Sequence, residues 1–255
     1  MKGRIIITTQ PHDQANKLIR LLTDRGARAE KYPMIRTQSK VLPKGKISEL
    51  LQQKGCNLLV FTSRKGVKGF FENLLRDSGD YHVPEEIRIA AIGSGTGEAL
   101  RYYGHEPHIM NPGTTAADLA DHLIKEHLLP HNKILLVQGN LSLGILKDAL
   151  TDRATFYAVV VYETLPEKQQ NPDLDQLILN QEAEMLVFTS PSAFYIFRER
   201  FPAISLPPIA VIGSTTAAAI RKAGFKVAAE ASTPEPQALA EAIEQYFRNS
   251  EKQKE

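Results

Sequence analysis

One short motif occurs twice in this sequence, and it restricts what the chain can fold into. An apolar run ends in Phe-Thr-Ser at positions 61–63 and again at positions 188–190, and an amphipathic helical pattern follows each copy. The apolar run predicts a buried strand, and the serine is a preferred N-cap for the following helix. Each helix start leaves backbone N–H groups that can bind an anion. We therefore expect two similar lobes with anion-accepting edges.

The motif belongs to a longer internal repeat. Leu22-Thr23-Asp24-Arg25 returns as Leu150-Thr151-Asp152-Arg153, and Gly93 and Leu119 correspond to Gly213 and Leu239. The offset between the copies shortens along the chain, and the loss falls in the loop around 77–84, where deletions are tolerated. The order of elements is constant, so we interpret the repeat as a real duplication. By itself the repeat would divide the chain near Pro130.

Strands that alternate with helices at this spacing predict α/β architecture. We expect two small parallel sheets, each flanked by helices, rather than one long sheet. Ligands of such sheets bind beyond the carboxyl ends of the strands. The two Thr-Ser pairs and the loops that begin at Gly93 and Gly213 fall at those ends.

Composition excludes several classes of function. Among 255 residues, Lys and Arg number 31 and Asp and Glu 29, so the net charge of +2 gives no reason to expect nucleic-acid binding. Neither a signal peptide nor a membrane span is evident, so we expect a cytoplasmic protein without membrane contact. The single cysteine, Cys56, fits a reducing compartment and is expected to be a small residue at a strand entrance rather than a catalytic thiol.

The sequence gives little support for a cofactor or a metal. The stretch from Gly93 to Gly97 resembles a dinucleotide loop, but its glycine spacing is incomplete and its repeat copy loses two glycines. The histidine pair at helical spacing, His127 and His131, has Pro130 between its members, and no ligand cluster accompanies it. We expect neither a cofactor nor a metal.

Short hydroxyl and amide side chains gather at the expected strand ends. They are Ser63, Ser94, Thr96, Asn140, Ser190, Ser214 and Thr216. Each can be a helix cap, which is the commoner role, and a capped helix start still offers N–H groups to a carboxylate or phosphate. We interpret the set as lining a cleft between two lobes that holds a polyanion, with Ser63 opposite Ser190.

Tyr162 is the candidate for proton transfer. It ends the apolar run 159–161, and its spacing from Tyr157 would put the two tyrosines on opposite faces of a regular strand. A structural tyrosine is the alternative. A phenol beside a cleft can also protonate a leaving hydroxyl, and no other residue offers itself for that role.

These motifs, taken together and in order, resemble the uroporphyrinogen-III synthase family. The resemblance spans nearly the whole chain. It rests on both Phe-Thr-Ser copies, Ile89 to Thr96, Ile209 to Thr216, Gly139-Asn140-Leu141, Val161-Tyr162-Glu163-Thr164, and Thr233-Pro234 followed by Gln237-Ala238-Leu239.

The resemblance implies a two-lobed monomer whose lobes are not the two halves of the repeat. Residues 1–36 would join 168–255 in one lobe, and 37–167 would form the other. The extended segments at about 30–38 and 159–166 would form a two-stranded linker, because each follows a first helix and leads out of a lobe.

The implied activity is that of a lyase (hydro-lyase) of porphyrin and heme biosynthesis, without metal or cofactor. It would convert the linear tetrapyrrole hydroxymethylbilane to uroporphyrinogen III, with loss of water and inversion of the last pyrrole ring. Tyr162 matches the family tyrosine proposed to assist loss of the hydroxyl. The expected substrate-binding residues are Ser63, Ser94, Thr96, Gly139, Asn140, Ser190, Ser214 and Thr216.

The chain departs from the family pattern at two positions. Gln10 and Gln138 stand where many bacterial members have arginine. Arg64, Lys65 and Lys147 are candidates to supply the missing positive charge. Two other functions stay open from the residues alone: a non-enzymatic two-lobed protein that binds a small polyanion, and a nucleotide-dependent transferase that uses the loop at 93–97.

Overall fold

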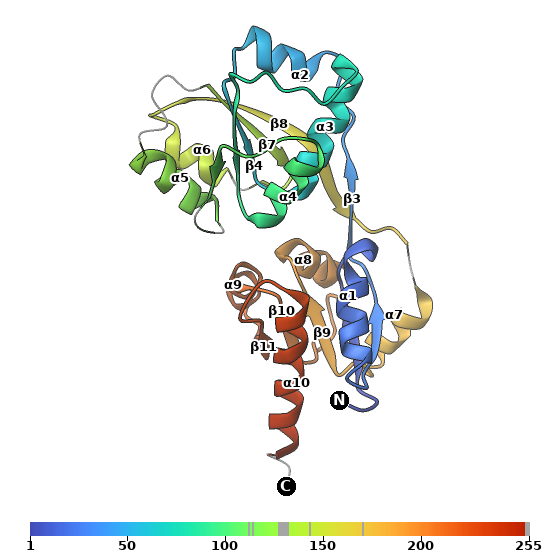
Figure 1. Ribbon diagram of the computed structural model, residues 1–255. Helices are drawn as coiled ribbons and strands as arrows, with labels where there is room; N and C mark the ends of the chain where they lie inside the picture. The colour runs from blue at the N-terminus through green and yellow to red at the C-terminus, as the bar shows by residue number, and fades with distance from the viewer. Residues whose placement is uncertain (112, 114, 127–132, 143, 170, 253–255) are drawn as a thin grey trace. The chain divides into compact units, whose positions relative to one another are not determined.

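The computed structural model describes residues 1–111, 113, 115–126, 133–142, 144–169 and 171–252 (Figure 1). Pro130, where the repeat alone would divide the chain, and the pair His127 and His131 lie outside these residues. The chain packs into two compact units. Unit 1 combines Met1–Arg36 with Leu165–Glu255, and unit 2 is Thr37–Thr164. The chain therefore returns from unit 2 to unit 1 after residue 164, three residues before the expected boundary after residue 167.

Unit 1 is a five-stranded parallel sheet in the order β11-β10-β9-β1-β2. Its strands are β1 (Ile5–Thr8), β2 (Arg28–Lys31), β9 (Met185–Phe188), β10 (Ile209–Val211) and β11 (Ala229–Glu230). One face packs on α1 (His12–Thr23) and α10 (Pro236–Lys252). The other face packs on α7 (Pro172–Leu179), α8 (Pro191–Arg200) and α9 (Ser214–Lys222).

Unit 2 is a six-stranded sheet in the order β3-β8-β7-β4-β5-β6. Its strands are β3 (Ile35–Ser39), β4 (Leu58–Phe61), β5 (Arg88–Ala91), β6 (Ile109–Met110), β7 (Lys133–Gly139) and β8 (Thr155–Pro166). One face packs on α2 (Lys46–Ser48), a π-helical turn η1 (Glu49–Gln53), α3 (Arg64–Ser78) and α4 (Ser94–Tyr102). The other face packs on α5 (Ala116–Lys125) and α6 (Ile145–Leu150).

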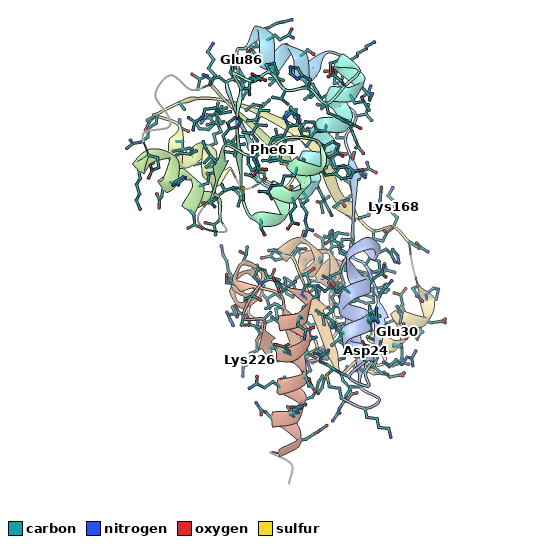
Figure 2. The ribbon with its side chains drawn as sticks, in the orientation of Figure 1. Asp24, Glu30, Phe61, Glu86, Lys168 and Lys226 are labelled. Atoms are coloured by element: carbon teal, nitrogen blue, oxygen red, sulfur yellow. The ribbon has the colours of Figure 1, made fainter. Side chains whose placement is uncertain are left out.

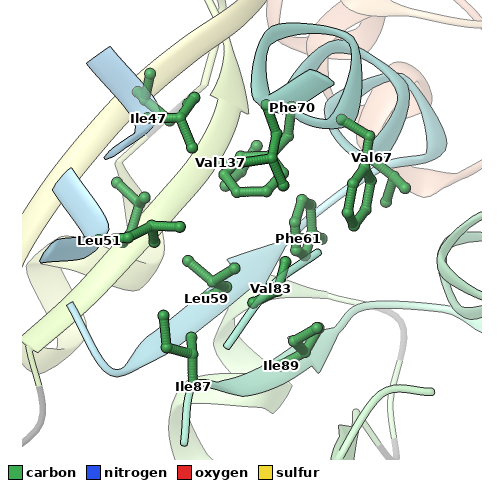
Figure 3. Close-up of a cluster of buried hydrophobic side chains, with 14 of the residues drawn as sticks. Ile47, Leu51, Leu59, Phe61, Val67, Phe70, Val83, Ile87, Ile89 and Val137 are labelled. Atoms are coloured by element: carbon green, nitrogen blue, oxygen red, sulfur yellow. The ribbon is translucent and has the colours of Figure 1, made fainter. Parts of the chain in front are cut away.

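The alternation of side chains along the strands assigns the core residues to two layers. In β4, Leu59 and Phe61 face α3, whereas Leu58 and Val60 face α5 and α6. Figure 3 shows the α3 layer, in which the Phe61 and Phe70 rings meet edge to face with centroids 5.3 Å apart. Phe61 lies inside unit 2, whereas Glu86 and Lys226 lie at the surfaces of their units (Figure 2). Both faces of the sheet are buried, as expected for parallel strands.

The two units share one strand order, although neither is a contiguous copy of the repeat. The order β6-β5-β4-β7-β8 of unit 2 corresponds to β11-β10-β9-β1-β2 of unit 1. The strand with the first Phe-Thr-Ser motif, β4, pairs with β7, and the strand with the second, β9, pairs with β1. Each unit therefore combines the opening strands of one repeat with the later strands of the other. The predicted fold class, parallel sheets flanked by helices, is confirmed.

Helix α7 was not expected from the sequence, and the extended segment expected at 30–38 contains two separate strands, β2 and β3. Helix α7 begins at the Asn171-Pro172 pair, where the Asn171 side chain accepts a hydrogen bond from the Leu174 N–H. The extended segment expected across 30–38 is interrupted between β2 and β3, which belong to different sheets. The buried Tyr32, in this interruption, donates its hydroxyl hydrogen to Asp175 of α7 and so fastens the chain to unit 1.

Candidate functional site

The two Phe-Thr-Ser motifs have the local structure that their sequence predicts. The Ser63 hydroxyl accepts a hydrogen bond from the Gly66 N–H at 3.1 Å, and the Ser190 hydroxyl accepts one from the Ala193 N–H at 3.2 Å. Both serines are thus N-caps, of α3 and α8, at the carboxyl ends of β4 and β9. Both hydroxyls are half-buried, so they remain at the edges of their sheets.

The next helix along each repeat starts differently. Helices α4 and α9 have Gly93 and Gly213 as N-cap residues, and neither makes a side-chain capping bond. Ser94 and Ser214 are the first helical residues and lie exposed, whereas Thr96 and Thr216, two residues further along, are buried in the first turn. The role of helix cap considered for these four residues is therefore wrong. A glycine cap leaves the first N–H groups of the helix without a side-chain acceptor, so they stay available to an anion.

A β-bulge determines where Tyr162 points. In the ladder between β7 and β8, Gln138 pairs with Val160 but Gly139 pairs with Tyr162, so Val161 is the extra residue. The bulge reverses the alternation, and both Tyr157 and Tyr162 pack against the α3 layer. The expectation that the two tyrosines lie on opposite faces is therefore wrong, because it assumed a regular strand.

Tyr162 is held between a glycine and a serine. A Cβ atom on Gly139 would lie 2.5 Å from Cζ and 2.8 Å from the hydroxyl oxygen of Tyr162, so only glycine allows this approach. The Ser63 hydroxyl donates to the Tyr162 hydroxyl oxygen at 3.3 Å. The phenol is half-buried at the carboxyl edge of the unit 2 sheet, and the hydrogen bond from Ser63 does not use the phenolic hydrogen.

Asn140 locks the strand on which Tyr162 lies. Its side-chain amide donates to the Thr164 carbonyl at 3.2 Å and accepts from the Thr164 N–H at 2.8 Å. Its backbone N–H donates to the Tyr162 carbonyl at 3.2 Å. Both ends of the amide are thus used within unit 2, and Asn140 fixes β8 on either side of Tyr162.

The cationic side chains near this edge have different surroundings. The Lys65 ammonium donates to the Thr37 hydroxyl at 2.7 Å. The exposed Arg64 side chain crosses Gly95, where an added Cβ would lie 3.1 Å from Arg64 Nε. Arg64 therefore has its guanidinium beside the uncapped start of α4. No ion pair involves Arg64 in the described part of the chain.

Gln10 and Gln138, where the family resemblance led us to expect arginine, have different surroundings. Gln10, in unit 1, is buried, and its side-chain oxygen lies 3.4 Å from the Thr8 hydroxyl. Gln138, in unit 2, is half-buried and lines a cavity at the carboxyl edge of the sheet together with Thr62 and Ser142. Sequence reasoning missed this cavity. The alternation of side chains in β4 and β7 could have predicted that Thr62 and Gln138 lie on one face of the sheet. It could not have predicted that a cavity lies between them.

Cys56 has the structural role that was expected. It is buried in the α3 layer, and burial raises the pKa of its thiol because the charged thiolate would be desolvated. Within the described ranges, His, Cys, Asp and Glu side chains form no group of three that could hold a metal ion. Of the helices described, none combines the length and apolar character required to span a bilayer.

The fold and these edges define a class: two-unit α/β proteins that present neutral donors, helix N-termini and a positioned phenol at the carboxyl ends of parallel sheets. Residues 16–241 match the family model described as uroporphyrinogen-III synthase HemD. Because this match spans most of the sequence, the chain belongs to the uroporphyrinogen-III synthase family.

Individual relatives agree with this assignment. The chain is 28% identical to the uroporphyrinogen-III synthase of Chlorobaculum parvum, over 88% of this chain and 91% of the relative. It is 26% identical to the porphyrin biosynthesis protein HemD of Ruminiclostridium josui, over 91% of this chain but 46% of that longer protein.

Solved structures share the fold. A uroporphyrinogen III synthase mutant from Thermus thermophilus matches with a TM-score of 0.69 at 19% identity, over 97% of this chain and 100% of that one. The enzyme from Helicobacter pylori matches with a TM-score of 0.66 at 19% identity, over 95% and 99%.

The contact between Gly139 and Tyr162 is testable by a double-mutant cycle. We expect Gly139→Ala to destabilise the protein by about 1–3 kcal/mol, because the new methyl group overlaps the Tyr162 ring. In a Tyr162→Ala background the same change should lower the free energy of unfolding much less, because the ring is absent. Urea unfolding of the four proteins measures both costs. Equal costs in the two backgrounds would contradict the contact.

Proposed function

We propose that this protein closes the linear tetrapyrrole hydroxymethylbilane to uroporphyrinogen III, with inversion of the last pyrrole ring. The family match supports the substrate class, and the observation that carries the mechanism is the Tyr162 hydroxyl held at the sheet edge by Gly139 and Ser63. The reaction breaks a C–O bond and releases water, which makes the enzyme a hydro-lyase. It involves no net oxidation or reduction, so its balance requires no redox cofactor.

In the proposed mechanism Tyr162 acts as the general acid. The hydroxyl of the terminal hydroxymethyl group leaves as water when its oxygen receives the phenolic proton, and the adjacent pyrrole nitrogen stabilises the carbocation that remains on the methylene carbon. Attack by the last ring at its substituted carbon gives a spiro intermediate, whose rearrangement inverts that ring. When the macrocycle closes, the pyrrole carbon that forms the new bond loses a proton, which restores the phenol. Because the phenol oxygen accepts the hydrogen bond from Ser63, the phenolic hydrogen is not used in that bond and can be donated to the leaving group.

The carboxylate arms of the substrate are proposed to bind the carboxyl edges of the sheets. In unit 2 the donors are the start of α4 with Ser94, and Arg64 beside it. In unit 1 they are the corresponding start of α9 with Ser214, and the capped start of α8 at Ser190. Uncapped helix starts and one guanidinium suit a ligand whose negative charge is spread over several arms.

Four of the predicted substrate-binding residues are better assigned supporting roles. Thr96 and Thr216 lie buried behind the helix starts and would support the donors rather than touch substrate. Gly139 and Asn140 would position Tyr162. The alternative of a non-enzymatic polyanion-binding protein receives no support from the matched relatives. Cytoplasmic location, a monomeric state and the lack of nucleic-acid partners stay predictions.

The activity is tested by supplying the purified protein with freshly made hydroxymethylbilane. After oxidation, the products are separated into porphyrin isomers. We expect the type III isomer to dominate, because only an enzyme that inverts the last ring can form it. If the mixture contains only the type I isomer, which forms spontaneously, the proposed function is wrong.

Replacement of Tyr162 by phenylalanine isolates the proton transfer. We expect Tyr162→Phe to lower kcat by roughly a hundredfold, the lower end of the range for general acid catalysis, while KM and Tm change little. The ring still packs on Gly139, so the fold is retained. If kcat for formation of the type III product is unchanged, Tyr162 is not the general acid and its role is structural.

Arg64 is expected to contribute to substrate binding. We expect Arg64→Gln to raise KM about fivefold, close to 1 kcal/mol, because one charge-assisted contact to a carboxylate is lost. The matched control is Lys68→Gln, one turn along α3, which removes the same charge from a surface pair with Glu72 at 3.7 Å. Equal KM values in the two variants would contradict a specific role for Arg64.

A further inference from the structure

A cavity at the carboxyl edge of the unit 2 sheet has no role in the mechanism above. Its volume is about 250 Å³. It lies on the sheet face that packs on α5 and α6, and its lining comes from the ends of three neighbouring strands, from the turn after β7 and from the starts of α5 and α6. The lining residues are Thr62, Ile92, Ala116, Leu136, Gln138, Ser142, Gly144, Ile145 and Leu146.

The lining divides into an apolar floor and a polar rim. Ile92, Leu136 and Leu146 are buried members of the core layer under α5 and α6. Strand alternation then brings Thr62 and Gln138 to the same face, one step beyond the last core positions Val60 and Leu136. The mouth includes the half-exposed Ile145, which is 45% accessible to solvent.

The size and chemistry of the cavity suit a single small ring. A cavity of about 150 Å³ with an aliphatic lining can hold benzene, whereas pockets for drug-sized ligands start at about 300 Å³. The 250 Å³ here can therefore take one pyrrole ring and part of its arms, but not a tetrapyrrole. Among the described residues, none that lines the cavity is charged. Aliphatic side chains can contact the ring faces, while amide and hydroxyl groups can pair with a pyrrole N–H and a carboxylate.

We propose that this cavity is the subsite for one pyrrole ring of the linear tetrapyrrole, an inference that rests on the proposed function. Ile92, Leu136 and Leu146 contact the faces of the ring. Thr62, Gln138 and Ser142 bind its N–H group or the carboxylate arms that leave the mouth. The uncharged side chain of Gln138 keeps this subsite neutral.

The subsite ring is distinct from the reacting end of the substrate. Tyr162, Gly139 and Ser63 lie on the sheet face that packs on α3, whereas the cavity opens on the opposite face. A bound substrate would cross the carboxyl edge of the sheet between the two. Filling the cavity should therefore weaken binding, and so raise KM, while kcat at saturation changes little.

The test fills the cavity from α5, where Ala116 is the first helical residue and Ala117 is its exposed neighbour. We expect Ala116→Leu to raise KM for hydroxymethylbilane about tenfold with kcat within twofold of wild type. Ala117→Leu adds the same side chain outside the cavity and should leave both constants unchanged. Ile145→Ala removes part of the cavity wall at an exposed position and should also raise KM. This variant tests the subsite if Ala116→Leu destabilises the protein and lowers its Tm.

A direct binding measurement separates this proposal from the proposed function. The probe is a monopyrrole with one acetate and one propionate arm, added to the full chain and followed by amide chemical shifts. We expect shifts at Thr62, Gln138 and Ser142 in wild type and in Ala117→Leu, and their loss in Ala116→Leu. An active wild type that shows no such shifts, or an unchanged KM in both cavity variants, overturns the subsite. A wild type that forms only type I isomer overturns the activity instead.

Discussion

The structure depends on the pairing of strands that come from different copies of the repeat. In unit 2, β4 from the first copy lies against β7 from the second, and in unit 1, β9 from the second copy lies against β1 from the first. These central pairs bury Leu59 against Leu135 and Ile7 against Leu186, so neither core is complete without both parts of the chain. Because the two copies exchange strands, the chain must pass between the units twice. It does so near β3 and at the end of β8.

A second constraint acts at the end of that pairing. The parallel ladder between β7 and β8 is regular up to Gln138 and then gains one residue. This bulge turns Tyr162 toward α3 and presses its ring on Gly139, and the Asn140 side chain closes the ladder beyond it through Thr164. The phenol is therefore placed by backbone geometry and close packing. A residue positioned in this way is preorganised, which is what a general acid requires.

We assign different roles to the two faces of the unit 2 sheet at its carboxyl edge. On the α3 face are the phenol, its serine neighbour and the serine-capped start of α3; on the other face is a neutral cavity with aliphatic walls. Arg64 and the glycine-capped start of α4 add positive charge at the same edge. In the mechanism that we propose, separate groups are assigned to the chemistry, to ring recognition and to charge neutralisation. Such spaced contacts would hold a flexible linear substrate in one geometry, and restriction of this kind can be a large part of a catalytic effect.

Local features of the sequence determined most of the elements and several contacts. Ser63 and Ser190 are N-caps because a serine that follows an apolar strand satisfies the first N–H groups of the next helix. The repeat and the alternation of strands and helices determined the fold class. The ordered motifs identified the family and singled out Tyr162. These inferences succeed because each depends on residues that are close together in the chain.

Tertiary structure decided what the local sequence leaves open. The same repeats could pair within one copy or between copies, since both arrangements bury the same apolar faces. The repeat could not decide between them; the family resemblance implied the exchange, and the strand orders of the two sheets show it. The bulge at Gly139 reversed the predicted side of Tyr162, because one extra residue inverts a period of two. The Arg64–Gly95 contact and the cavity beneath α5 and α6 join segments distant in sequence. Their geometry comes from packing, which no local pattern encodes.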